Sequence, residues 1–151
     1  MRILLVIDIQ PCFKVEPYYS QVLDYIKCHR DKYDKIIATR FIPKQDSVRS
    51  QVKNLTKYNK REQLEFEYDT LIGKSTCEIG VKNYKKLLEG NEVYIIGCDT
   101  DACVLATCFQ LADNNIPFKV IREFCYSTWG KEYHEAGIKV LEKNFGKKVF
   151  G

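Results

Sequence analysis

The sequence is poor in the residue groupings that build metal sites and disulfide frameworks. It has two histidines, His29 and His134, which lie far apart, and its seven cysteines include no C-x-x-C pair. Zinc sites need grouped cysteine and histidine side chains, and an odd cysteine count without an export signal argues against a disulfide framework. We therefore expect free thiols, no bound metal and no cofactor.

Long apolar runs and strong charge are missing as well. No apolar stretch approaches the roughly 18–20 residues of a membrane span, and residues 1–10 are too short and too soon polar for a signal peptide. The net charge of +4 is mild, and the lysines are spread along the chain with only short clusters such as Lys85-Lys86 and Lys147-Lys148. We expect a cytoplasmic protein that binds neither membranes nor nucleic acids.

The 151 residues, 45% apolar and 29% charged, have the composition of one globular domain, residues 1–151. Apolar runs alternate with amphipathic segments, a rhythm typical of βαβ units and a mainly parallel sheet. We predict a three-layer α/β/α domain. Its expected strands are Met1–Ile7, Asp34–Thr39, Tyr68–Gly73, Glu92–Gly97, Phe118–Arg122 and an edge strand at Lys148–Phe150, and its expected helices are Tyr18–Asp31, Ser47–Tyr58, Gly80–Leu88, Asp101–Asn114 and Lys131–Asn144.

Three residues with chemical potential lie at or just past the carboxyl ends of predicted strands: Asp8, Lys74 and Cys103. Such ends meet at one edge of a parallel sheet, so these side chains can converge although they are distant in sequence. Cys103 would lie in the first turn of a helix, where N–H groups and the helix dipole favour a thiolate. Each residue alone has a simpler explanation, as a turn residue, a solvated charge or a core thiol. Their joint placement favours a covalent catalyst with a carboxylate base, an ammonium partner and a thiolate nucleophile.

Two segments resemble the isochorismatase-like cysteine hydrolases, the superfamily that includes nicotinamidases and N-carbamoyl amide hydrolases. The segment Gly97–Thr107 matches the family pattern G-x-x-T-D-x-C-V-x-x-T at every fixed position, and Asp8–Phe13 is similar to its D-x-Q-x-x-F start. Lys74 falls where the family carries its lysine. The resemblance runs from Met1 to the last helix, and it implies a six-stranded, Rossmann-like parallel sheet between helices.

The same resemblance implies the chemistry. Asp8 would be the base, Lys74 the electrostatic partner and Cys103 the nucleophile that cleaves an amide-type C–N bond through a thioester. It also implies a cis peptide between Cys98 and Asp99, and an oxyanion hole formed by the backbone amides of Asp99 and Cys103. Homodimers and homotetramers are common among such relatives, so we expect a homo-oligomer that acts on a small molecule.

The sequence departs from the nicotinamidases where they carry a D-x-H…H metal site. The corresponding segment, Thr39–Ser47, has no histidine to pair with Asp46, so we do not expect bound Zn²⁺ or Fe²⁺ and reject a metal-bearing nicotinamidase. Arg40 could bind a substrate carboxylate or be solvated, and we favour the latter. Aromatic walls of the substrate pocket are predicted at Phe13, Tyr126 and Trp129, although Trp129 could equally pack against a helix or a partner subunit.

Several alternatives stay open. The sequence does not decide between amide, ester and vinyl-ether cleavage, and it does not identify the substrate. Asp99-Thr100-Asp101 superficially matches the D-x-D start of a class of Mg²⁺-dependent phosphatases, but no acidic pair follows a strand further along the chain. A non-catalytic binding or assembly module of the same fold is a third possibility, against which the retention of Asp8, Lys74 and Cys103 argues.

Overall fold

A single parallel sheet organises the protein. The computed structural model describes residues 1–53, 55–58 and 61–151. Within these ranges the strands lie in the order β3-β2-β1-β4-β5, and every neighbouring pair is parallel. The strands are β1 (Arg2–Ile7), β2 (Lys35–Phe41), β3 (Thr70–Lys74), β4 (Glu92–Cys98) and β5 (Phe118–Tyr126).

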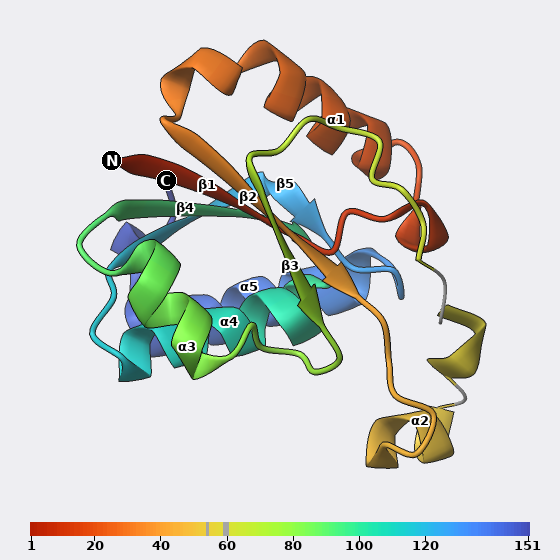
Figure 1. Ribbon diagram of the computed structural model, residues 1–151. Helices are drawn as coiled ribbons and strands as arrows, with labels where there is room; N and C mark the ends of the chain where they lie inside the picture. Colours follow the sequence, from red (N-terminus) through yellow and green to blue (C-terminus); the bar gives the residue numbers. More distant parts are fainter. Residues whose placement is uncertain (54, 59–60) are drawn as a thin grey trace.

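Helices cover both faces of the sheet, as predicted for a three-layer α/β/α domain (Figure 1). One face carries α1 (Tyr18–Cys28), and the other carries α3 (Val81–Asn83), α4 (Leu105–Asp113) and α5 (Lys131–Phe145). The turn of π-helix η5 (Thr100–Val104) precedes α4, and a second one, η4 (Tyr84–Leu88), follows α3. None of the helices in the described ranges has the length and apolarity needed to cross a bilayer. The remaining short helices are α2 (Val48–Lys53), η1 (Pro11–Phe13), η2 (Arg30–Lys32), η3 (Leu55–Tyr58) and η6 (Lys147–Val149).

The predicted count of six strands is wrong, because the described residues form a five-stranded sheet. The expected edge strand at Lys148–Phe150 is mostly the 3-10 helix η6, and only Phe150 makes an isolated parallel bridge, to Val120. Gly146 ends α5 with φ +77° and turns the chain directly into η6. Only the last residues of the chain, from Phe150 on, therefore lie alongside β5. The predicted helix Ser47–Tyr58 divides into α2 and η3, and its residue 54 lies outside the described residues.

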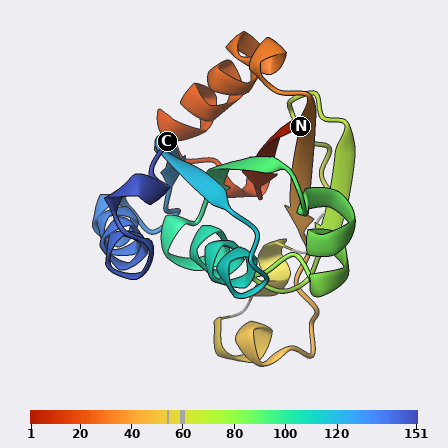
Figure 2. The same cartoon turned by 90° about the vertical axis from the view of Figure 1, so that its left-hand side faces the viewer.

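The central strand β1 is buried on both faces, which explains its unbroken apolar sequence. Because successive side chains of a strand point to opposite faces, Ile3, Leu5 and Ile7 join one apolar cluster, whereas Leu4 and Val6 join the other. Figure 2 shows α1 on one side of the sheet and α4 on the other. Each such side chain stabilises the fold by about 1.5–3 kcal/mol relative to an exposed one. The two apolar clusters therefore fix the register of β1 and the position of its carboxyl end.

The order of the strands creates one switch point. The chain runs outward from β1 through β2 to β3, then crosses to the other side of β1 and continues through β4 to β5. Ligands of open α/β sheets bind outside the carboxyl ends of strands where the order reverses, which here is the gap beyond β1 and β4. Asp8 follows β1 and Asp99 follows β4, so both lie at this point.

Gly97 sets the close approach of β1 and β4 at the switch point. Its φ is +130°, and a Cβ at this position would lie 2.2 Å from the carbonyl oxygen of Ile7. We expect Gly97→Ala to lower the free energy of unfolding by about 3 kcal/mol or more, measured by urea denaturation, because neither backbone can yield without breaking the β1–β4 ladder. Gly73→Ala in β3 is the matched control, since nothing lies within 4 Å of its Cβ and its φ is ordinary. An equal loss in both variants would contradict the steric explanation.

Candidate active site

Asp8 is held rigidly at the end of β1. It has φ +52°, a left-handed conformation that aspartate and asparagine tolerate better than most residues. Its N–H donates to Thr39 Oγ1 at 2.9 Å, and the Thr39 hydroxyl in turn donates to Asp8 Oδ1 at 2.5 Å. Thr39 comes from the neighbouring strand β2, so the sheet itself fixes the carboxylate, which is 2% exposed.

Lys74 is the last residue of β3, and it forms a buried ion pair with Asp8. Nζ lies 2.9 Å from Asp8 Oδ2, and both side chains are 2% exposed. The same ammonium donates to the carbonyl oxygens of Thr76 at 2.9 Å and Cys77 at 3.1 Å. Burial opposes the charge, yet the Asp8 carboxylate and the Cys103 thiol hold the pKa of Lys74 above its ordinary value. The raised pKa keeps the Lys74 ammonium charged, and its contact with Asp8 and its two carbonyl hydrogen bonds offset the cost of burying it.

Cys103 lies in the π-turn η5, which begins immediately after β4. The carbonyl oxygen of Asp99 accepts hydrogen bonds from the N–H groups of Ala102 and Val104, both at 3.1 Å, and these bonds close the turn around Cys103. The peptide bond between Cys98 and Asp99 is cis, as the family resemblance implied. The predicted placement of Cys103 in the first turn of a helix is confirmed.

The expected thiolate at Cys103 does not follow from the helix start alone. A hydrogen bond with the Cys77 thiol, burial and the Asp8 charge raise the pKa of Cys103 well above its ordinary value. The Cys103 hydrogen bond, opposed by burial and assisted by the charges of Arg49 and Lys74, lowers the pKa of Cys77 to about 6. The two thiols are coupled, so near neutral pH the pair as a whole carries one negative charge.

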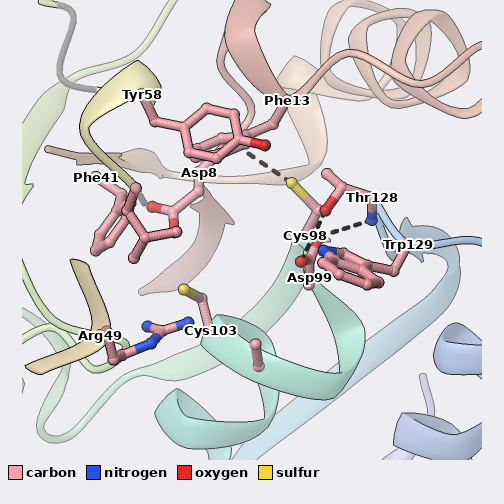
Figure 3. Close-up of a pocket in the computed structure, with 12 residues that line it drawn as sticks. Asp8, Phe13, Phe41, Arg49, Tyr58, Cys98, Asp99, Cys103, Thr128 and Trp129 are labelled. Carbon is pink, nitrogen blue, oxygen red and sulfur yellow. Dashed lines mark hydrogen bonds between the residues drawn. The ribbon is translucent and has the colours of Figure 1, made fainter. Parts of the chain in front are cut away.

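A small hollow of about 90 Å³ opens above these groups, and Figure 3 shows Asp8, Arg49 and Cys103 around it. The predicted walls Phe13 and Trp129 both line it. The predicted wall Tyr126 does not line it. Its ring is buried, and its hydroxyl donates to the Phe13 carbonyl oxygen at 2.8 Å. Tyr126 thus supports Phe13 rather than the pocket surface. The other lining residues are Phe41, Leu55, Tyr58, Cys98, Asp99, Ala102 and Thr128.

Sequence reasoning missed three residues of the site: Thr39, Arg49 and Cys77. Thr39 had a usable signal, since it ends a predicted strand just as Asp8 does. Arg49, from α2, and Cys77, from the loop after β3, had none, because no strand end or motif distinguishes them. The arginine weighed as a substrate ligand, Arg40, is half-buried rather than solvated, does not line the pocket, and donates to the Glu62 carbonyl at 3.4 Å.

Asp99, the first acid of the Asp99-Thr100-Asp101 segment, has a structural explanation. Asp99 accepts hydrogen bonds from the Thr128 N–H at 2.7 Å and the Thr128 hydroxyl at 2.9 Å, and burial raises the pKa of Asp99. Its carboxylate is thus committed to the loop after β5 instead of facing a phosphoryl group. Thr100 Oγ1 pairs with His134 Nδ1 at 2.7 Å, which ties η5 to α5.

The residues do not fit the metal site that nicotinamidases carry. In the described part of the chain, no three His, Cys, Asp or Glu side chains converge so as to hold an ion. The segment after β2 offers one carboxylate, Asp46, which is exposed and has no imidazole near it in sequence. The donor set at this position therefore does not match a site for Zn²⁺ or Fe²⁺.

The fold and the position of the site define this protein as a three-layer parallel α/β protein whose site lies at a topological switch point. A comparison of its sequence with models of protein families identifies the family. Residues 2–149 match the model of the isochorismatase domain family. The chain belongs to this family, which confirms the predicted membership of the isochorismatase-like hydrolases. A search of curated proteins gives no significant match.

Solved structures agree with the fold at low sequence identity. An isochorismatase-like hydrolase from Alkaliphilus metalliredigens is similar with a TM-score of 0.75 and 17% identity, over 94% of this chain and 91% of that one. A nicotinamidase from Bacillus subtilis gives 0.73 and 14%, over 99% of both chains. A pyrazinamidase of Pyrococcus horikoshii, solved in complex with zinc, gives 0.74 and 18%, over 94% of both chains.

Proposed function

We propose that this protein is a metal-independent cysteine hydrolase that cleaves an amide-type C–N bond of a small molecule. The observation that carries the proposal is the buried ion pair of Asp8 and Lys74 with its 2.9 Å contact, because Asp8 lines the same hollow as Cys103. Burying two charges costs several kcal/mol each before compensation, so such a pair beside a pocket favours a chemical role over a stabilising one.

The first half of the reaction forms a thioester. Asp8 takes the thiol proton, and the Cys103 sulfur forms a bond to the carbonyl carbon while the π electrons of the C=O bond move to oxygen. The N–H groups of Asp99 and Cys103 face the resulting oxyanion. The C–N bond then breaks, and the nitrogen leaves as ammonia or an amine after it takes a proton from Asp8.

The second half releases the acid. Asp8, again ionised, accepts a proton from water as the water oxygen attacks the thioester carbon, and the thiolate leaves. Throughout, Lys74 keeps the Asp8 carboxylate oriented through its 2.9 Å contact and stabilises anionic charge beside the sulfur.

The hollow limits the class of substrate. Its volume of about 90 Å³ and its aromatic walls Phe13, Phe41 and Trp129 suit the reacting end of a small amide or carbamoyl compound rather than a polymer. The expected homodimer or homotetramer stays a prediction, as does the binding of small molecules alone.

A panel of small amides, N-carbamoyl compounds and esters tests the proposal. We expect at least one amide or carbamoyl compound to release ammonia or amine, and mass spectrometry of the quenched reaction to show an acyl group on the Cys103 peptide. Treatment with a chelator is expected to leave the rate unchanged. If no compound reacts above the buffer rate and no acyl adduct forms, the chain is better described as a non-catalytic binding member of its family.

A further inference from the structure

A second cysteine lies at the site without a role in the proposed reaction. Cys77 follows Lys74 by three positions, and the loop after β3 folds back so that the Lys74 ammonium donates to the Cys77 carbonyl oxygen at 3.1 Å. The Cys77 side chain is partly buried and packs against the apolar cluster that contains Cys103. The Cys77 and Cys103 thiols also act on each other's ionisation, since their interaction lowers the pKa of Cys77 and raises that of Cys103.

Two cations bracket this pair of sulfurs. The Lys74 ammonium donates to the Cys77 carbonyl oxygen, and an Arg49 guanidinium N–H donates to Cys77 Sγ. Figure 3 shows the same guanidinium reaching into the hollow toward the Cys103 sulfur. The Arg49 guanidinium therefore contacts the Cys77 sulfur and points toward the Cys103 sulfur, and Cys103 lines the hollow.

The ion pairs at the site leave one cation without a carboxylate partner. Asp8 neutralises Lys74 across 2.9 Å, which leaves Arg49 as a pocket cation with no carboxylate partner among the described residues. One shared thiolate is the natural counter-ion. A thiol and a thiolate in contact are the reactants from which a disulfide forms once either sulfur is oxidised.

We propose that Cys77 and Cys103 form a redox-active dithiol, in which a hydroperoxide oxidises one sulfur and the other closes a Cys77–Cys103 disulfide. In the first step a thiolate attacks the terminal oxygen of the hydroperoxide, the O–O bond breaks, and a sulfenic acid and an alcohol or water result. In the second step the other sulfur attacks the sulfenic sulfur and expels its hydroxyl group as water. Two thiols lose two electrons to one hydroperoxide, and a dithiol reductant reverses the change.

The other cysteines do not share these features. Cys98, Cys108 and Cys125 are buried, and burial raises the pKa of each thiol. Burial and Glu62 raise the pKa of Cys12 to about 12. Cys28 is exposed in α1, on the opposite face of the sheet from α4. Oxidation at low hydroperoxide concentration is therefore expected to select the Cys77–Cys103 dithiol.

The test uses the full chain, fully reduced, treated with a small excess of hydrogen peroxide at pH 7 and then blocked with N-ethylmaleimide. We expect non-reducing peptide mapping to show Cys77 joined to Cys103, an intact mass lower by two hydrogen atoms, and recovery of both thiols with dithiothreitol. Oxidation of Cys103 to the sulfinic acid without this cross-link, or no oxidation of either residue, would overturn the proposal. So would the same mixture of cross-links from native and urea-unfolded chains.

Three variants sharpen the test. Cys77→Ser is expected to abolish the cross-link and to let Cys103 oxidise irreversibly, whereas Cys28→Ser is expected to form the cross-link at the wild-type rate. The exposed Arg49 offers a variant that does not threaten folding. Oxidation of the wild type should be half-maximal near pH 6, where Cys77 ionises, and Arg49→Gln is expected to move that midpoint up by about one pH unit. An unmoved midpoint, with an unchanged rate, would contradict the role of the guanidinium.

A Cys77–Cys103 disulfide would occupy the proposed nucleophile and so block hydrolysis. This consequence rests on the proposed function, whereas formation of the cross-link does not. The mass measurement needs no substrate, so it can succeed if the protein hydrolyses nothing. Conversely, if Cys103 is acylated during turnover but never forms a disulfide with Cys77, the dithiol proposal is refuted and the hydrolase proposal stands.

Discussion

Cys103→Ala is expected to lower amide hydrolysis roughly 10³-fold or more while the fold is retained. The reason is chemical, because no other described group lining the hollow could form a thioester except Cys98, whose buried thiol donates to the Asp8 carbonyl oxygen at 3.4 Å. Burial raises the pKa of Cys98 well above its ordinary value, so it is not a substitute nucleophile. Steady-state rates on the best substrate of the panel, with acyl-adduct mass spectrometry, measure the effect.

Two matched controls separate chemistry from packing. Cys108→Ala removes a fully buried sulfur from the same apolar cluster, at the fourth residue of α4, so it should cost stability without removing turnover. Cys28→Ala removes an exposed sulfur and should change neither. Retention of more than a tenth of the wild-type rate in Cys103→Ala would refute the assignment of the nucleophile.

Lys74→Met is expected to lower the free energy of unfolding by about 3–5 kcal/mol and to remove turnover. Methionine keeps most of the apolar stem, so the loss isolates the ammonium that lies 2.9 Å from Asp8 Oδ2. Without it, a carboxylate that is 2% exposed stays in the core with Thr39 as its remaining side-chain partner. Urea denaturation followed by circular dichroism measures the change.

A double-variant cycle identifies the ion pair as the cause. Asp8→Asn should destabilise by a similar amount, and asparagine suits the left-handed backbone at this position, so strain does not confuse the result. The variant with both changes should recover roughly 0.5–3 kcal/mol relative to the sum of the single losses. Lys131→Met, at the exposed pair with Glu135, is the control and should change stability by less than about 1 kcal/mol. Strict additivity at Asp8 and Lys74 would mean that the two charges do not interact.

In this cycle the double variant is expected to regain stability without regaining activity. The double variant regains part of its stability because it buries no unpaired charge, but it has lost both the base and its electrostatic partner. A double variant as active as the wild type would exclude Asp8 and Lys74 from the reaction even if Cys103 is essential.

Much of the fold was readable from local patterns. The apolar run before Asp8 could only be a strand buried on both faces, and the alternation of strands with helices left a parallel, three-layer sheet as the simple outcome. The prediction of an edge strand at Lys148–Phe150 was wrong because three residues carry too little pattern to separate a strand from a turn of helix. The prediction of Tyr126 as a pocket wall was wrong for a related reason, since a position after a strand does not show in which direction the ring points.

The candidate site divides along the same line. Asp8, Lys74 and Cys103 could be placed at strand ends before the fold was known, because local apolar periodicity marks where a buried strand stops. The contact between Arg49 and the Cys77 sulfur could be found only in the folded chain, because the segments after β2 and β3 carry no periodic signal and the two residues are 28 positions apart. The tertiary structure also decided which thiol ionises first, since the pKa of a buried thiol depends on the charges and hydrogen bonds that folding brings to it, and no single residue of the chain encodes that environment.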